Sequence, residues 1–293
     1  MTRIRIDSIE DPRVLDYRDQ KDAWLRVQEA ADAGRASTGL PDGLFMAEGL
    51  LVVEQVLRSR HTVRSILGTP ARLDALEDRV GTIPADLPVY VARQGVLDGI
   101  AGFSIHRGLL ACARAAPAPL LDDLLARTTT LVVLEDLSNH DNVGGVFRNV
   151  AALGGEHAAV LLSPRCCDPL YRKAIRVSMG HVLRVPFGRS VDWPGDLERV
   201  KRAGFVTIAL TPSPEAAELS SQARGAVTEP ADADASASAD ARRVALLLGA
   251  EGPGLSVEAF SRADVIARIP MASGVDSLNV AVVCALALDR LGR

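Results

Sequence analysis

Residues 131–162 read LVVLEDLSNHDNVGGVFRNVAALGGEHAAVLL, and this stretch decides the fold. The apolar run Leu131–Leu134 is typical of a buried strand, and so is His157–Leu162. Between these runs, an Asn/Gly turn leads into a helical pattern over Asn142–Leu153. A strand, a helix and a second strand in this order predict a parallel βαβ unit.

The same alternation continues toward the C-terminus. Further strands are predicted at Val182–Val185, Phe205–Leu210, Val244–Leu248 and Val265–Ile269. Further helices are predicted at Asp168–Met179, Asp192–Ala203 and Ser277–Leu291. This order is typical of an α/β fold with a mainly parallel sheet and helices on both of its faces.

A smaller α/β pattern precedes the first strand of this sheet. It has a helical stretch at Glu48–Ser59 and short strand-like runs at Val63–Leu67, Val89–Ala92 and Gly108–Ala113. The sequence AAPAPL at Ala115–Leu120 interrupts regular structure with two prolines. We therefore predict a small domain at residues 1–115, a linker at 116–126 and a larger domain at 127–293.

The charges are unevenly distributed along the 293 residues, whose net charge is −4. Pro212–Ala241 carries six acidic residues and one basic residue and lacks apolar periodicity, so we expect a flexible acidic insertion at about 215–241. His140–Ala203 carries ten basic and six acidic residues. A net-negative chain ordinarily argues against a nucleic-acid partner, but a basic middle segment can meet phosphates.

The sequence leads us to expect neither a secreted nor a membrane-spanning protein. The N-terminus has no apolar segment typical of a secretory signal, and no apolar run is long enough to span a membrane. The four cysteines have no metal-ligand spacing, so we expect reduced packing residues and no metal site. The expected location is the cytoplasm.

Three loops that follow predicted parallel strands carry the polar residues of interest, because such loops bind ligands in open α/β sheets. The first is Glu135–Asn149. Asn142 can cap the helix, Gly144 and Gly145 can let the backbone turn sharply or approach a ligand, and Arg148 can point back toward the same face. A capped helix with one solvated arginine is the alternative interpretation of this loop.

The second loop reads GAEGPG at Gly249–Gly254. Its three glycines and one proline favour a backbone packed against a flat ligand, with Glu251 in the cleft, over a plain structural corner. It matches neither a dinucleotide fingerprint nor a P-loop, so a nucleotide diphosphate is not the expected ligand.

The third loop, Ile269–Asn279, reads IPMASGVDSLN and leads into an almost wholly apolar helix. We expect Ser277 or Asp276 to start that helix. Asn279 then falls in its first turn, where a buried amide needs several partners. It can satisfy the helix end, or it can hold a loop or a substrate.

Taken in order, these motifs resemble the SpoU branch of the SPOUT RNA methyltransferases. The pattern N-x-G-x-x-x-R matches Asn142, Gly144 and Arg148. The pattern G-x-E-G-x-G follows a strand at Gly249–Gly254, and I-P-M with S-L-N matches Ile269–Met271 and Ser277–Asn279. The resemblance covers residues 131–293; less specifically, the first domain resembles the small α/β substrate-binding domain that often precedes this catalytic domain.

The resemblance implies a SPOUT domain with a C-terminal trefoil knot, a homodimer, and RNA as the partner. It implies S-adenosylmethionine (AdoMet) as methyl donor and a ribose 2′-hydroxyl of structured RNA as acceptor, with rRNA favoured over tRNA. By motif, the implied AdoMet contacts are Thr211, Gly249, Ile269 and Leu278. The residues implied around the reacting hydroxyl are Arg148, Asn142, Glu251, Ser277 and Asn279.

A mechanism follows from these implied roles as a hypothesis. Guanidinium stays protonated, so we expect Arg148 to grip an RNA phosphate and stabilise developing negative charge. We expect Asn142 and Asn279 to orient the ribose and the loop, and Glu251 to hold Arg148 or Asn279. The alternative is a non-catalytic RNA-binding or ribosome-associated protein that keeps the knotted fold. AdoMet titration separates the two.

Overall fold

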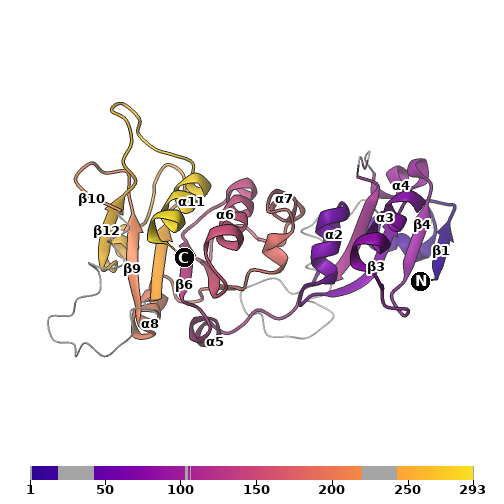
Figure 1. The fold of residues 1–293 in the computed structure, drawn as a ribbon, viewed down its shortest axis with the longest axis horizontal. Helices are drawn as coiled ribbons and strands as arrows, with labels where there is room; N and C mark the ends of the chain where they lie inside the picture. The colour runs from indigo at the N-terminus through magenta and orange to yellow at the C-terminus, as the bar shows by residue number, and fades with distance from the viewer. Residues whose placement is uncertain (1, 19–42, 103–104, 106, 220–242, 293) are drawn as a thin grey trace. The chain divides into compact units, whose positions relative to one another are not determined.

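The computed structural model describes residues 2–18, 43–102, 105, 107–219 and 243–292 (Figure 1). The chain divides into two compact units. Unit 1 comprises Met1–Pro117 together with Asp168–Arg184, and unit 2 comprises Ala118–Cys167 together with Val185–Arg293.

Unit 1 contains a mixed sheet of order β1-β4-β3-β5-β2. Its strands are β1 (Arg3–Ile6), β2 (Leu44–Glu48), β3 (Thr62–Gly68), β4 (Val89–Ala92) and β5 (Leu109–Arg114). Its helices are η1 (Pro12–Tyr17), α2 (Leu50–Leu57), α3 (Pro70–Val80), α4 (Gln94–Ala101), α7 (Arg172–Val177) and η2 (His181–Leu183). β1, β4 and β3 pair in parallel, whereas β5 pairs antiparallel with β3 and β2.

Unit 2 is built on a sheet of order β10-β12-β9-β11-β6-β7-β8. Its strands are β6 (Thr130–Leu134), β7 (Ala158–Leu162), β8 (Phe187–Arg189), β9 (Phe205–Leu210), β10 (Ala217–Glu218), β11 (Arg243–Leu248) and β12 (Val265–Arg268). Every pairing between these strands is parallel. The parallel sheet predicted from the alternating strand and helix patterns is therefore confirmed.

Helices cover both faces of the unit 2 sheet. They are α5 (Leu121–Ala126), α6 (His140–Leu153), α8 (Asp196–Arg202), α10 (Val257–Ser261) and α11 (Val280–Leu291). Alternate residues of the central strands, such as Leu131 and Val133, pack in one core with Leu124 of α5 and Leu197 of α8. On the other side, α6 and α11 pack against each other. α/β layering of this kind buries a strand such as β6 on both faces, which explains its uninterrupted apolar sequence.

Some predicted element boundaries are wrong. The apolar run at Val182–Val185 is not a strand: it contains the 3-10 helix η2, and the strand that pairs with β7 is β8. Gly180, with φ of 82°, turns the chain immediately before η2. Three or four apolar residues satisfy either period, so the pattern alone did not distinguish the two structures.

The contacts divide the chain differently from the predicted domain limits. Residues Asp168–Arg184 pack with unit 1, although they lie between strands of unit 2 in the sequence. Part of the predicted linker at 116–126 is the helix α5, which begins after the two prolines. Within the predicted acidic insertion, Ala217–Glu218 forms the short strand β10, and residues 220–241 lie outside the described residues.

Candidate active site

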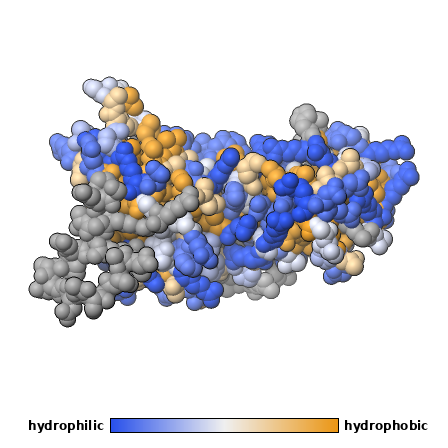
Figure 2. All heavy atoms as spheres, in the orientation of Figure 1, coloured by the Kyte–Doolittle hydropathy of each residue, from blue (hydrophilic) through white to orange (hydrophobic). Residues whose placement is uncertain are grey.

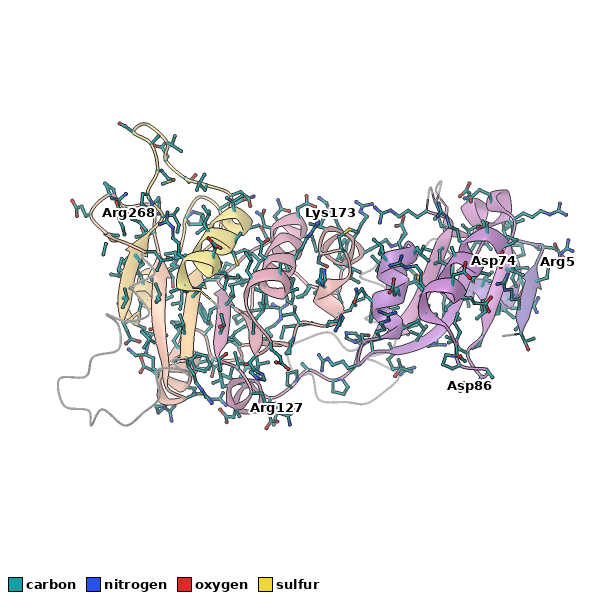
Figure 3. The ribbon with its side chains drawn as sticks, viewed as in Figure 1. Arg5, Asp74, Asp86, Arg127, Lys173 and Arg268 are labelled. Atoms are coloured by element: carbon teal, nitrogen blue, oxygen red, sulfur yellow. The ribbon has the colours of Figure 1, made fainter. Side chains whose placement is uncertain are left out.

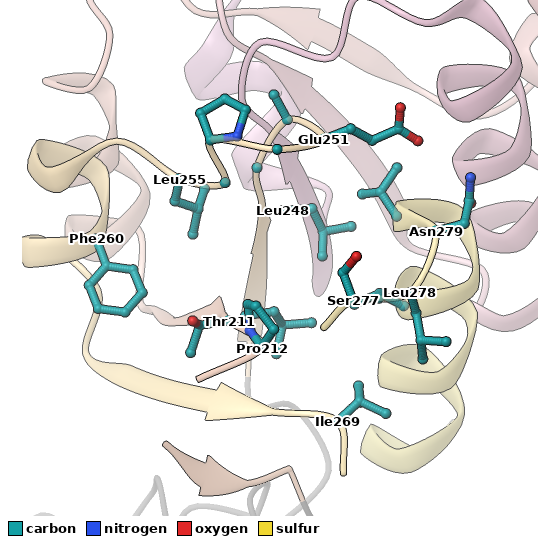
Figure 4. Close-up of a pocket in the computed structure, with 18 of the residues that line it drawn as sticks. Thr211, Pro212, Leu248, Glu251, Leu255, Phe260, Ile269, Ser277, Leu278 and Asn279 are labelled. Carbon is teal, nitrogen blue, oxygen red and sulfur yellow. The ribbon is translucent and has the colours of Figure 1, made fainter. Parts of the chain in front are cut away.

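A cavity of about 590 Å³ opens at the carboxyl ends of three adjacent strands of unit 2, β9, β11 and β12 (Figure 4). Loops from all three strands and the start of α11 form its walls. The lining residues are Leu210–Pro212, Leu248–Leu255, Phe260, Ile269, Met271, Ser277–Val280 and Val283. The carboxyl edge of a parallel sheet is where α/β proteins bind ligands, so the position favours a binding site.

The loop after β11 is shaped by its glycines. A Cβ atom on Gly249 would lie 2.1 Å from the carbonyl carbon of Gly254, which leaves no room for any side chain. The Gly254 N–H donates to the Ala250 carbonyl at 3.0 Å, and this bond closes the loop on itself. Gly252 and Gly254 have φ values of 88° and 74°, which favour glycine. The loop therefore presents backbone atoms to the cavity.

Three polar side chains form a hydrogen-bonded chain across the loops. The Asn142 amide Nδ2 donates to Glu251 Oε1 at 2.5 Å, and Asn279 Nδ2 donates to Asn142 Oδ1 at 2.8 Å. Asn279 Oδ1 accepts the N–H of Ala281 at 2.8 Å and so caps α11. Asn142 is buried, whereas Glu251 and Asn279 are exposed at the cavity. The first, second and third sequence motifs thus meet at Asn142.

The predicted helix caps are wrong in detail. Asn139, rather than Asn142, caps α6, and its Oδ1 accepts the N–H of Asp141. The last helix begins at Val280, capped by Asn279, rather than at Ser277 or Asp276. The predicted helix starts were displaced because several polar residues precede each helix and all can cap it.

Gly145 and Asn149 fix the packing of α6 against α11. Gly144, Gly145 and Asn149 all lie within α6, so the sharp turn, one of the two roles expected of the paired glycines, does not occur. A Cβ on Gly145 would lie 2.8 Å from the Ala281 Cβ, and Asn149 Nδ2 donates to the Ala281 carbonyl at 2.6 Å. Glycine lets the two helices approach closely. The hydrogen bond from the Asn149 side chain fixes the position of the first turn of α11 beside Asn142. Asn149 was missed because one more polar residue in a helix gives no distinct pattern.

Arg148 lies apart from the other predicted site residues. It is exposed on α6 and does not line the cavity. Asn142 and Asn149 are seven residues apart and share one helix face, from which Arg148 is rotated by about 100°. By contrast, the structure brings Thr211, Gly249, Ile269 and Leu278 together in the cavity wall, with Glu251, Ser277 and Asn279.

The cysteines of the described part of the chain lie outside the cavity lining. All four cysteines are free. Burial raises the pKa of Cys167 and Cys284 to about 12, so these thiols stay protonated near neutral pH. Among the described residues, no three His, Cys, Asp or Glu side chains gather as a metal site, and no helix is long and apolar enough to span a membrane.

Comparison with known proteins gives the family. The sequence profile of the SpoU rRNA methylase family matches residues 129–289. An uncharacterized tRNA/rRNA methyltransferase of Mycobacterium bovis is 41% identical over 280 residues, which cover 95% of this chain and 88% of that protein. The chain belongs to the SpoU rRNA methylase family. It is an RNA methyltransferase of that family, and the resemblance seen in the motifs is confirmed.

Solved structures show the same fold over nearly the whole chain. The AdoMet-bound rRNA methyltransferase from Sinorhizobium meliloti aligns with a TM-score of 0.70 and 23% identity, covering 98% of this chain and 97% of that one. The SpoU methyltransferase AviRb from Streptomyces viridochromogenes aligns with a TM-score of 0.68 and 20% identity, covering 96% of each chain. The α/β fold of SPOUT methyltransferases is thereby confirmed, while the trefoil knot stays a prediction.

Proposed function

We propose that this SpoU-family protein transfers a methyl group from AdoMet to the ribose 2′-hydroxyl of a structured RNA, with rRNA favoured over tRNA. The observation that carries the proposal is that the second and third motifs line one and the same cavity and are joined to the first motif through Asn142. A solved structure with the same fold is described as an RNA 2′-O ribose methyltransferase, at 24% identity.

The residues of the cavity fit AdoMet. Its walls combine apolar side chains, such as Leu248 and Phe260, with exposed backbone of the glycine loop (Figure 4). Small-ligand sites typically have this composition, with a few polar groups that fix orientation. Thr211, Gly249, Ile269 and Leu278 hold AdoMet in this proposal. Bound there, AdoMet supplies an electrophilic methyl group on a sulfonium.

The chain of amides positions the acceptor. Both functional groups of Asn142 are already engaged, one by Glu251 and one by Asn279, so its orientation is fixed before a ribose arrives. Holding the hydroxyl in line with the methyl carbon supplies much of the rate of such a displacement. Asn142, Asn279 and Ser277 orient the ribose, and Glu251 holds Asn142 rather than either of the partners predicted for it.

Arg148 acts on the RNA in this proposal. Its exposed guanidinium grips a phosphate next to the target ribose and stabilises the negative charge that develops on the hydroxyl oxygen as the hydroxyl proton passes to solvent water. Single-turnover methylation at saturating RNA tests this role. Arg148→Ala protein that methylates at the wild-type rate would remove Arg148 from the chemistry.

The sequence between the two acidic residues Asp168 and Asp192 supports RNA as the partner. Pro169–Val191 contains five basic residues and no acidic residue, and its Lys173 and Arg176 are exposed on α7 (Figure 3 labels Lys173). Binding to RNA phosphates needs such a concentration of positive charge.

The test of the proposed function is a map of 2′-O-methylated positions in total RNA from cells with and without the gene. We expect one ribose, or a few, in rRNA to lose the modification when the gene is absent. Base methylation in place of ribose methylation would contradict the proposed acceptor, and a lost site in tRNA would contradict the rRNA preference. AdoMet titration excludes the non-catalytic alternative if the protein binds AdoMet.

A further inference from the structure

Glu135 is a buried carboxylate directly after β6, with 3% of its surface exposed. It does not line the cavity, and no part of the mechanism above uses it. A carboxylate is rarely buried unless hydrogen bonds compensate for the lost water, so its partners indicate what it does.

Those partners lie at the two ends of the glycine loop. The Glu135 backbone N–H donates to the carbonyl of Leu248, the residue before Gly249, at 2.9 Å. Its side chain accepts from Ser256, the residue after Leu255: the Ser256 N–H donates to Oε2 at 2.7 Å and the hydroxyl donates to Oε1 at 2.7 Å. One residue therefore holds both ends of the loop Gly249–Leu255.

Two further bonds make this attachment rigid. Trp193 Nε1 donates to Glu135 Oε1 at 2.6 Å, which fixes the carboxylate from a third direction. The Ser256 Oγ accepts the N–H of Ala259 at 3.1 Å and so caps α10. An ionised carboxylate only accepts hydrogen bonds, and here it meets three donors, which is its preferred arrangement.

We propose that Glu135 is a positioning residue that sets the shape of the AdoMet-binding loop, an inference that rests on the function proposed above. Within the loop, Gly249 packs so closely on Gly254 that a Cβ would not fit, and the Gly254 N–H bonds to the Ala250 carbonyl. In its middle, Glu251 must reach Asn142. A shift at either end of the loop would therefore move both the backbone that faces AdoMet and the carboxylate that orients Asn142.

Glu135→Gln is the decisive variant, because it keeps the side chain's size and replaces one accepting oxygen by an amide that faces a donor. We expect calorimetry to give a Kd for AdoMet about tenfold higher than wild type, as for the loss of a hydrogen bond to a charged group. We also expect faster amide hydrogen exchange in Gly249–Leu255, with exchange in β7 unchanged. The measurements are made well below the Tm of each variant.

Asp196→Asn is the matched control. It makes the same change at another buried carboxylate of unit 2, whose hydrogen bonds come from Ser190–Asp192 and Arg199 and not from the loop, so we expect a lower Tm with an AdoMet Kd within twofold of wild type. An unchanged Kd in Glu135→Gln protein would overturn the inference. So would an equal rise in both variants, because it would report general destabilisation.

A second variant covers the case in which Glu135→Gln does not fold. Ser256→Ala loses the hydroxyl bond to Glu135 but keeps the backbone bond, so we expect the Kd for AdoMet to rise about threefold; an unchanged Kd would overturn the inference. Wild-type protein that binds no AdoMet would overturn the proposed function and this inference together. If the wild-type protein binds AdoMet and the variants bind it with the same Kd, the inference is overturned and the proposed function is not.

Discussion

Asn142 joins residues that are far apart in the sequence: 109 positions separate it from Glu251 and 137 from Asn279. All three residues could be selected from their motifs. Their pairing could not, because it depends on which loops the sheet order brings together. Glu251 was expected to hold Arg148 or Asn279, but α6 turns Arg148 to the surface and Asn142 toward the loop.

We predict that Asn142→Ala lowers kcat at least about tenfold. The substitution removes the amide proposed to orient the ribose, and both Glu251 and Asn279 lose a hydrogen bond. Single-turnover methylation measures the effect. Asn139→Ala is the control on the same helix: it removes the α6 cap, so we expect about 1 kcal/mol lower stability and an unchanged kcat. Equal rates for Asn142→Ala and wild type would remove this amide from the mechanism.

His61 predicts a pH dependence of stability in unit 1. Burial, with a smaller effect of Arg60, lowers the pKa of His61 to about 4, and its Nδ1 accepts the N–H of Ala116 at 3.0 Å. Because the unfolded histidine has a pKa near 6.5, the unfolded state binds more protons below that pH, and stability falls as the pH drops from about 6.5 to about 4.

The loss is on the order of 2–3 kcal/mol and is measured by urea unfolding across this pH range. In His61→Asn protein, the amide oxygen can still accept from Ala116, and the histidine contribution to the slope is absent. A variant with the same pH slope as wild type would contradict the assignment.

The apolar spacing of the sequence predicts some features of the helix α6 and not others. Its existence and its buried face follow from the apolar spacing after residue 140. Its contact with α11 does not, because a close crossing at Gly145 leaves no periodic trace in either helix. The strand β1 was missed for a similar reason: its sequence RIRI is short and half charged, and only pairing with β4 makes it a strand.

We predict that the basic helix α7 contacts RNA phosphates. We expect Lys173→Ala/Arg176→Ala to weaken RNA binding and to reduce the slope of log K against log salt by about 2, one unit for each lost phosphate contact. Arg127→Ala/Arg202→Ala removes the same charge from exposed positions in unit 2 (Figure 3 labels Arg127). Equal slopes for the two double variants would place the RNA elsewhere.

The helix α11 has exposed apolar residues through which two copies of the protein could associate. Val282 and Leu286, one helical turn apart, are 47% and 37% exposed, and Leu278 in front of the helix is 38% exposed. Figure 2 shows apolar side chains reaching the surface in this part of unit 2. We propose that this exposed apolar stripe is a contact surface of the homodimer that the family resemblance implies.

We predict that Val282→Glu shifts the protein from dimer to monomer in light scattering coupled to size-exclusion chromatography, because a buried unpaired carboxylate is costly. Leu120→Glu, at a residue 68% exposed in front of α5, is expected to leave the dimer intact. A wild-type monomer, or a dimeric Val282→Glu protein, would contradict an interface on α11.

The order of the seven parallel strands could not be predicted from the sequence. Local periodicity predicts individual strands and helices. It does not predict that β9 and β11 are neighbours, because strand order depends on how the connections between strands pass over the sheet. The assignment of Asp168–Arg184 to unit 1 has the same origin, since its residues have ordinary helix-forming patterns and only tertiary contacts place them. The family resemblance predicted more of the fold than the local sequence patterns did, because its motifs occur in proteins that share this fold.

The central claim is that loops from separate strands form one AdoMet site, and calorimetry of Gly249→Ala tests it most directly. Gly95→Ala is the control, because a Cβ there meets no atom within 4 Å. We predict that wild-type and Gly95→Ala proteins bind AdoMet alike, and that Gly249→Ala binds at least about tenfold more weakly because the added carbon forces the loop open. Folded Gly249→Ala protein with wild-type affinity would contradict the account.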